Sequence, residues 1–343
     1  MITTRELAKL AGVSQSTVSR SLNDNPGVDP MIKERVRSIA KEHGYVYEGK
    51  GKKKLRVLNR KFIGIVMLRN ISFLDNFFLN QISSLLIAAV ENSNYHAVMI
   101  QECYGYQGVS KLNDLMKLNV FDGFIIVNQQ YDEILPRHLK DMKIPYILLI
   151  YHNRLDDKKD NVIDTDNYLG AYMATEHLIK LGHKRIIALT TSLAEHNDRM
   201  QGYREALTDN GLEYDPKLVL STDCNYNAAY RVTLERIKTF RSATACFAQF
   251  DLGALGICNA LKKNGINVPK DFSIVGFDDL DISKIFDPAL TTIKQPLEQL
   301  TELAVNELIS SINSGNLVNP CVYLKPELIE RDSAAAAPEC SRS

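Results

Sequence analysis

Residues 3–23, TTRELAKLAGVSQSTVSRSLN, contain the clearest helix signals in the N-terminal part of the chain. Thr3 or Thr4 is placed to cap a helix, and Gly12 is placed to end it. Between them, apolar residues recur at three- and four-residue spacing, which indicates a helix with one buried face: Leu7, Leu10 and Ala11. A first short helix is therefore predicted.

A second helix is predicted almost at once after the first. Ser14 is placed to cap it, Val18 and Leu22 lie four residues apart on its inner face, and the Asn-Asp-Asn-Pro-Gly run at 23–27 ends it. A third helix is predicted from Pro30 to Gly44, with four apolar positions: Met31, Val36, Ile39 and Ala40. Three short helices, the first two joined by a tight turn with glycine, make a helix-turn-helix pattern.

The charge of the chain is distributed unevenly. Over 343 residues, 41 Lys and Arg balance 41 Asp and Glu, so the net charge is zero. Residues 1–60 nevertheless hold 13 basic and 6 acidic residues, a net charge of +7, which leaves −7 on the remainder. A basic head on an acidic body is typical of a chain with a polyanion-binding module.

Several classes of protein are excluded or disfavoured by the composition. The longest apolar stretches, such as residues 146–151, have the length of strands and fall far short of the ~20 residues of a membrane-spanning helix. The N-terminal residues do not form a secretory signal, so we expect a cytoplasmic protein. No two of the six cysteines have the spacing of a zinc or redox motif, so we expect reduced thiols, mostly buried, with no metal and no cofactor.

The body of the chain alternates strand-like and helix-like segments. Residues 48–61 are rich in Gly, Lys and Arg and are predicted to be a linker. After it, strands are predicted at 62–68, 96–100, 123–127, 146–150, 185–189, 244–248 and 272–276. Such alternation predicts an α/β fold of doubly wound parallel sheets, and its length favours two lobes over one.

The second predicted helix carries the side chains that suit a DNA groove. With Val18 facing inward, Gln15, Ser16 and Arg20 face outward. Gln pairs well with adenine and Arg with guanine in the major groove, while Ser and Thr hydroxyls suit phosphates. The alternative is a polar helix surface without a ligand.

The sequence resembles the LacI/GalR family of bacterial transcription regulators. The resemblance rests on ELAKLAGVS at 6–14, TVSRSLN at 17–23 and HGY at 43–45 in the head. It continues through RMQGYREAL at 199–207, VGFDD at 275–279 and PALTTIKQP at 288–296 in the body.

This resemblance implies a helix-turn-helix domain over 1–47, a hinge over 48–61 and a two-lobed core over 62–332 similar to periplasmic sugar-binding proteins. The chain would cross between the lobes near Asn161, Thr292 and Pro320. One lobe would then comprise 62–161 and 293–319, and the other 162–292 and 320–332. Residues 333–343 would form a flexible tail without leucine heptads, so no tetramer-forming coiled coil is expected.

The resemblance also assigns DNA contacts to individual residues of the head. Gln15, Ser16 and Arg20 would contact bases, and five residues would contact phosphates: Ser14, Thr17, Ser19, Asn23 and Tyr45. Asn23 has an alternative role as the residue that ends its helix. The hinge departs from the family, because it holds two glycines and no alanine, and each glycine costs a helix roughly 0.5 to 1 kcal/mol. Leu55 is the candidate for a side chain wedged into the minor groove.

For the effector, the resemblance implies a site between the lobes, at the carboxyl ends of the strands. The corresponding residues are Phe77, Phe78, Asp166, Arg199 and Asp278. Arg199 donates and Asp278 accepts, which together suit a polyol such as a sugar. The alternatives are a loop-capping ion pair for Arg199 and a turn for Asp278.

Other positions of the site depart from the family. Phe250 occupies the usual polar position before Asp251, and Cys224 the usual aromatic one. Phe250 would either stack on the ligand or belong to the core. Glu195 is a further candidate, with an exposed loop carboxylate as its alternative.

Together these residues predict a ligand-controlled transcription regulator, most simply a repressor that binds a palindromic operator as a homodimer, with a sugar or sugar derivative as effector. A transporter's solute-binding protein would share the body but lack the basic head. A glycoside hydrolase would use two carboxylates, yet adjacent Asp278 and Asp279 are poorly placed to flank one bond. We therefore expect no catalytic residues.

Overall fold

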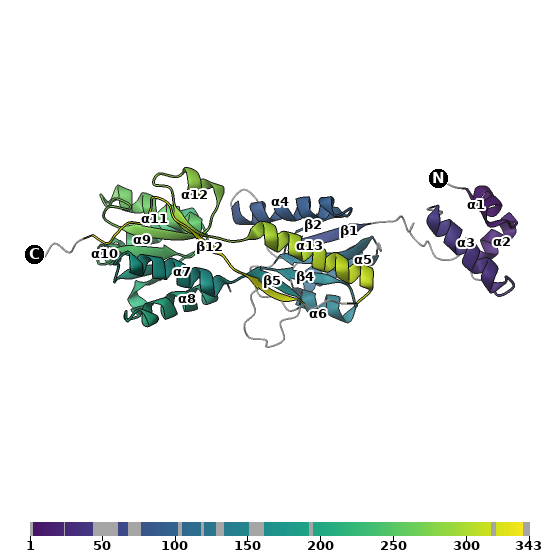
Figure 1. Ribbon diagram of the computed structural model, residues 1–343, viewed down its shortest axis with the longest axis horizontal. Helices are drawn as coiled ribbons and strands as arrows, with labels where there is room; N and C mark the ends of the chain where they lie inside the picture. Colours follow the sequence, from purple (N-terminus) through teal and green to yellow (C-terminus); the bar gives the residue numbers. More distant parts are fainter. Residues whose placement is uncertain are drawn as a thin grey trace, which may run out of the picture. The chain divides into compact units, whose positions relative to one another are not determined.

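The structure is a computed structural model that describes residues 3–23, 25–43, 61–67, 77–101, 105–117, 120–127, 134–150, 161–191, 195–316 and 320–338. Its head contains the helices α1 (Thr4–Ala11), α2 (Gln15–Leu22) and α3 (Pro30–Glu42) (Figure 1). The three helices pack around a small apolar core, which confirms the predicted helix-turn-helix fold: Leu7, Ala8, Ala11, Val18, Val36 and Ala40.

Each helix of the head begins at a local cap. The Thr3 hydroxyl accepts from the Glu6 amide while the Glu6 carboxylate accepts from the Thr3 amide, so Thr3 and not Thr4 is the cap. Gly12 ends α1 in the left-handed region, at φ 65°. One prediction was wrong: Leu10 is 52% exposed, because Ala8 and Ala11 lie on the face that packs against α2 and α3.

The body contains two six-stranded sheets. The first has the order β11-β5-β4-β3-β1-β2 and the second the order β12-β10-β9-β8-β6-β7. The strands of the first sheet are β1 (Phe62–Met67), β2 (His96–Ile100), β3 (Phe121–Val127), β4 (Tyr146–Leu149), β5 (Val162–Thr165) and β11 (Cys321–Leu324). Those of the second are β6 (Ile186–Thr190), β7 (Val219–Ser221), β8 (Ala245–Ala248), β9 (Ser273–Asp278), β10 (Thr291–Lys294) and β12 (Glu327–Ile329).

Parallel pairing dominates both sheets, as predicted. The pairs β3–β4, β4–β5 and β5–β11 are parallel in the first sheet, as are β6–β7, β6–β8, β8–β9 and β9–β10 in the second. The pair β10–β12 is antiparallel, because β12 follows β11 after only two residues and enters the second sheet from the opposite end.

The chain changes sheets a few residues later than expected. Residues 162–165 pair with β4 in the first sheet, and 291–294 pair with β9 in the second. The crossovers therefore follow Thr165 and Lys294, with the third between Leu324 and Glu327. The expected boundaries near 161, 292 and 320 came from the family resemblance, which does not reveal which neighbour a short strand pairs with.

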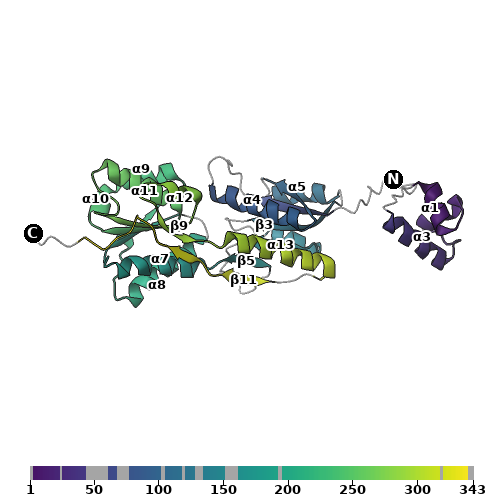
Figure 2. The same ribbon diagram turned by 45° about the horizontal axis from the view of Figure 1, so that its top comes forward.

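The two faces of the second sheet are covered by separate helix pairs. The helices α9 (Tyr226–Glu235) and α11 (Asp251–Lys263) pack together on one face, and α7 (Asn167–Lys180) and α8 (Glu195–Asp209) on the other (Figure 2). The short helices η1 (Pro216–Leu218), α10 (Ile237–Arg241) and α12 (Asp281–Ile285) lie in the connections.

In the first sheet, alternate residues of β1 and β3 face a core shared with α4 (Phe77–Asn92) and α13 (Leu297–Ser314). The helices α5 (Gly105–Lys117) and α6 (Ile134–Asp141) complete the connections between strands. None of the described helices has the length and apolar character needed to cross a membrane.

The segment from Ser333 differs from the flexible tail that we expected. The Ser333 hydroxyl, fully buried, accepts from the Thr291 amide at 2.8 Å and donates to the Ile274 carbonyl at 2.6 Å. The Ala335 carbonyl accepts from the Ser273 hydroxyl, and the Ala337 amide donates to the Leu181 carbonyl. Small side chains allow residues 333–337 to lie against the sheet, where they satisfy backbone groups of β9 and β10.

Candidate functional site

One exposed surface of α2 presents the predicted base-contacting side chains, with Gln15 and Ser16 in the first turn and Arg20 in the last. Gln15, Ser16 and Arg20 are all exposed, and Val18 on the opposite face is completely buried. The Ser14 hydroxyl caps the helix by accepting from the Thr17 amide at 3.1 Å. The cap fixes the helix start, so the exposed side chains project from a rigid backbone.

The predicted phosphate contacts have local structural partners. The Ser14 hydroxyl lies 2.8 Å from the hydroxyls of both Ser16 and Thr17. The Asn23 side-chain amide donates to the Ser19 carbonyl at 2.8 Å, so Asn23 does end its helix, and its side chain stays exposed. Tyr45 and Leu55 lie outside the described residues.

In the body, Arg199 and Asp278 come together at the carboxyl end of β9. Arg199 Nη2 lies 3.9 Å from Asp278 Oδ1, and the two residues are 4% and 8% exposed. The Arg199 guanidinium carbon stands 3.7 Å from the centre of the Phe277 ring, and Nη1 donates to the Gln249 carbonyl. A guanidinium held on three sides is a preorganised donor next to a preorganised acceptor.

A closed ring of buried polar contacts links this pair to two of the crossovers. The Gln295 amide donates to Asp278 Oδ1 at 2.8 Å and accepts from the Thr165 hydroxyl at 2.7 Å. Arg199 Nε donates to Asn167 Oδ1 at 2.8 Å, and the Asn167 amide donates to the Thr165 carbonyl at 3.0 Å. We call these five residues the crossover ring.

The other predicted ligand residues lie in different environments. Asp166 caps α7 by accepting from the Leu169 amide at 2.9 Å and is half-buried. Phe77 is 48% exposed at the start of α4, whereas Phe78 is buried in the core of the first sheet. Phe250 is 3% exposed and belongs to the apolar cluster around β8 and α11, where a Cβ on Gly253 would meet its ring at 2.6 Å. The side chain of Glu195 lies outside the described residues.

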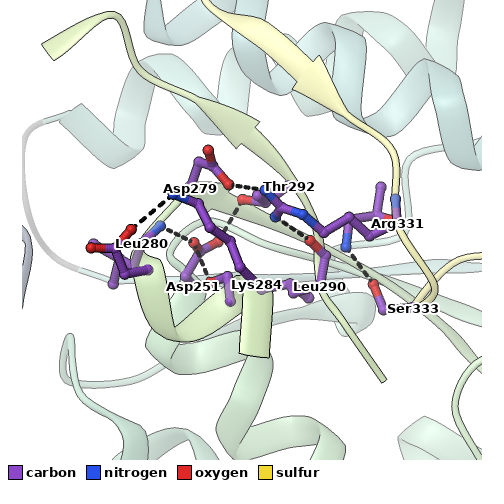
Figure 3. Close-up of polar contacts among 11 residues, drawn as sticks. Asp251, Asp279, Leu280, Lys284, Leu290, Thr292, Arg331 and Ser333 are labelled. Carbon is purple, nitrogen blue, oxygen red and sulfur yellow. Dashed lines mark hydrogen bonds and ion pairs between the residues drawn. The ribbon is translucent and has the colours of Figure 1, made fainter. Parts of the chain in front are cut away.

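Asp251, which the sequence motifs do not single out, holds the loop after β9. Asp251, fully buried at the start of α11, accepts from the Leu280 amide at 2.9 Å, the Ser283 hydroxyl at 2.7 Å and the Thr292 hydroxyl at 2.5 Å (Figure 3). Burial raises the pKa of its carboxyl, against the lowering effect of these hydrogen bonds. The signal in the sequence is a glycine inside a strand, Gly276. A Cβ at this position would lie 2.3 Å from Asp251 Oδ1, so glycine leaves room for this carboxylate.

Asp279 is held by a second partner. Its Oδ1 accepts from Arg331 Nη2 at 2.5 Å, and Arg331 Nη1 donates to the Leu290 carbonyl at 2.8 Å (Figure 3). Asp278 and Asp279 both have positive φ values, 125° and 57°. Residues in such sparsely populated regions persist only where their surroundings hold them, and they cluster at ligand sites.

This geometry argues against a pair of catalytic carboxylates. Asp278 contacts Arg199 and Gln295, whereas Asp279 contacts Arg331 from the C-terminal segment. The two carboxylates thus have separate partners. Among the described residues, no group of three His, Cys, Asp or Glu side chains is placed to hold a metal ion.

Family models match both the head and the body of the chain. Residues 3–47 match the bacterial regulatory proteins of the lacI family, and residues 175–334 match a periplasmic binding protein-like domain. A DNA-binding head on a ligand-binding type of body defines a class of transcription regulator.

Relatives over the full length identify the family. The chain is 32% identical to the HTH-type transcriptional regulator MalR of Clostridium butyricum, over 96% of this chain and 98% of the relative. It is 29% identical to the regulator CelR of Thermobifida fusca, over 95% and 96%. The chain therefore belongs to the LacI family of bacterial transcription regulators, whose members bind DNA and are not enzymes.

Solved structures agree with this assignment. A CelR–cellobiose complex superposes with a TM-score of 0.73 at 26% identity, covering 97% of this chain and all of the other. The lac repressor dimer bound to operator and the anti-inducer ONPF superposes with a TM-score of 0.72 at 25% identity, over 98% and 99%.

Proposed function

We propose that the chain is a cytoplasmic repressor that binds a palindromic operator as a homodimer and responds to a sugar or sugar derivative between its lobes. The main support for a bound sugar is that Arg199 and Asp278 are buried next to each other at the carboxyl ends of the strands. A fixed donor and a fixed acceptor suit the hydroxyls of a polyol. The cellobiose in the CelR complex supports this class of effector.

The dimer and the operator follow from the head. Two recognition helices related by a twofold axis would contact the two halves of a palindromic site. The structure of the lac repressor, a dimer bound to operator, supports this arrangement. Because the positive charge is concentrated in the head, operator affinity should fall steeply as the salt concentration rises.

The DNA-binding half of the proposal is tested with Arg20→Ala on an operator selected from random DNA by the purified protein. We expect affinity for that operator to fall about 10- to 100-fold and affinity for random DNA to change little. Arg35→Ala is the control, since it removes an equal, exposed charge from α3. If the two variants lose discrimination equally, Arg20 does not contact bases.

The ligand half is tested by thermal unfolding against a panel of sugars, sugar phosphates and nucleobases. A ligand at 100 times its dissociation constant stabilises the fold by about 2.7 kcal/mol. Asp278→Asn should abolish the shift that a sugar produces, whereas Asp281→Ala, at an exposed carboxylate paired with Lys284, should leave it unchanged. A panel without any stabilising sugar would contradict the proposed effector class.

A further inference from the structure

Gln295 lies where the chain leaves the second sheet for the first. It follows β10 directly and precedes α13, and it is 2% exposed. Its two side-chain atoms have different partners: Nε2 donates to Asp278 Oδ1 at 2.8 Å, and Oε1 accepts from the Thr165 hydroxyl at 2.7 Å. One planar amide thus joins a carboxylate of the second sheet to a hydroxyl of the first.

Thr165 occupies the corresponding place in another crossover. It is the last residue of β5, it is fully buried, and the chain continues from it to α7 on the second sheet. Thr165 and Gln295 lie 130 residues apart in the sequence. Their hydrogen bond therefore directly links two connecting segments that lie far apart in the sequence.

We propose that Gln295 is a positioning residue that couples the Asp278 carboxylate to both of these crossovers. The inference rests on the proposed function, in which the effector binds Arg199 and Asp278. A ligand hydroxyl that donates to Asp278 competes with Gln295 for the same carboxylate. The Gln295 amide is planar, and its oxygen accepts from Thr165. A change in the hydrogen bonds of Asp278 therefore alters the hydrogen bonds that hold both crossovers.

The energetics favour a positioning role over simple packing. An apolar side chain of similar shape would fill the same space without the cost of burying an amide. Buried polar contacts with every partner satisfied specify one arrangement, and breaking one leaves the other group unsatisfied. Coupling of this kind is reciprocal, so the crossovers must influence Asp278 as much as Asp278 influences them.

The test uses hydrogen–deuterium exchange on the full chain with Thr165→Val, which removes the hydroxyl donor and keeps the shape. We expect exchange to rise about tenfold at 295–300 and about threefold at 276–280, far from the substitution in sequence. In a Gln295→Met background, the same substitution should leave exchange at 276–280 unchanged. That dependence on Gln295 distinguishes coupling from a general loss of stability.

Thr175→Val and Thr301→Val are matched controls. Both hydroxyls are buried, and each donates within its own helix, Thr175 to the Ala171 carbonyl and Thr301 to the Leu297 carbonyl, at 2.9 Å in both cases. The controls should raise exchange only in α7 and α13, respectively. All variants are compared at equal global stability, which urea unfolding measures.

Two results would overturn the inference. Exchange at 276–280 could stay unchanged in Thr165→Val, or it could rise equally in the presence and absence of Gln295. Both readouts are made without a ligand, so a failed sugar panel would refute the effector class and leave the coupling result to be judged separately.

Discussion

Asp251 should tolerate replacement by asparagine and not by alanine. Its carboxylate accepts from the Leu280 amide and from the hydroxyls of Ser283 and Thr292, all in a site closed to solvent. In Asp251→Ala these three donors lose their acceptor. The two hydroxyls can turn toward other acceptors, but the backbone amide cannot.

The magnitude follows from those contacts. An unsatisfied buried donor costs about 1–3 kcal/mol, and removing one partner of a buried charged network costs about 3–5 kcal/mol in total. Part of this cost is offset, because the alanine variant no longer buries a charge. We therefore expect Asp251→Ala to lose about 3 kcal/mol, which lowers the Tm by roughly 6–12 °C for a domain of this size.

In Asp251→Asn the side-chain oxygen still accepts from Leu280 and Ser283, and the Thr292 hydroxyl turns to accept from the new amide. The loss should stay below about 1.5 kcal/mol. Urea and thermal unfolding measured by circular dichroism compare the two variants. Equal losses, or a loss below about 1 kcal/mol in the alanine variant, would refute the role of these hydrogen bonds.

The pH dependence provides a second check on Asp251. Because burial raises the pKa of its carboxyl, the folded chain binds this proton more tightly than the unfolded chain does. The Asp251 contribution to stability therefore falls as the pH rises from about 3.9 toward the folded pKa. The difference in stability between Asp251→Asn and the wild type should move in favour of the variant over that range, and a movement in the opposite direction would contradict the effect of burial.

Three further predictions concern the second lobe. Burial lowers the pKa of His183, whose ring nitrogens lie 2.9 Å from Thr244 Oγ1 and 3.0 Å from the Ala335 carbonyl. The free energy of unfolding should therefore fall as the pH drops below about 6.5, and urea unfolding should show a smaller fall in His183→Asn than in the wild type. Ending the chain at Asp332 should cost about 2–4 kcal/mol relative to a chain ending at Pro338, because the hydrogen bonds of Ser333, Ala335 and Ala337 are lost, and equal Tm values would disprove their contribution. Gly202→Ala would place a Cβ 2.2 Å from the Tyr168 carbonyl oxygen, so α7 and α8 must move apart. We expect the free energy of unfolding to fall by about 1–3 kcal/mol, and a fall of less than about 0.5 kcal/mol in thermal unfolding would contradict this close contact.

The head illustrates what local sequence predicts well. Its caps, glycine turn and helical periodicity involve residues within four positions of one another, so all three helices were predictable. Leu10 was misassigned because periodicity identifies an apolar stripe but does not decide which edge of the stripe meets a neighbouring helix.

Part of the geometry of the candidate ligand site could be predicted. Arg199 and Asp278, which the family resemblance assigns to one site, do lie next to each other. Asp251, Gln295 and Arg331 were not singled out, because their roles depend on partners 17 to 130 residues away. Phe250 had two open interpretations, and its burial in the core is a property of the packed lobe.

The helix-turn-helix head, the alternating α/β body and the separation of a basic head from an acidic body can all be predicted from the amino-acid sequence, because each depends on local pattern and composition. Three features became visible only in the folded chain: where the chain changes sheets, the position of residues 333–337 against β9 and β10, and the link that Gln295 makes between Thr165 and Asp278. These features are pairings between distant segments. Their stability comes from burial and hydrogen bonds that form only after the two sheets are assembled.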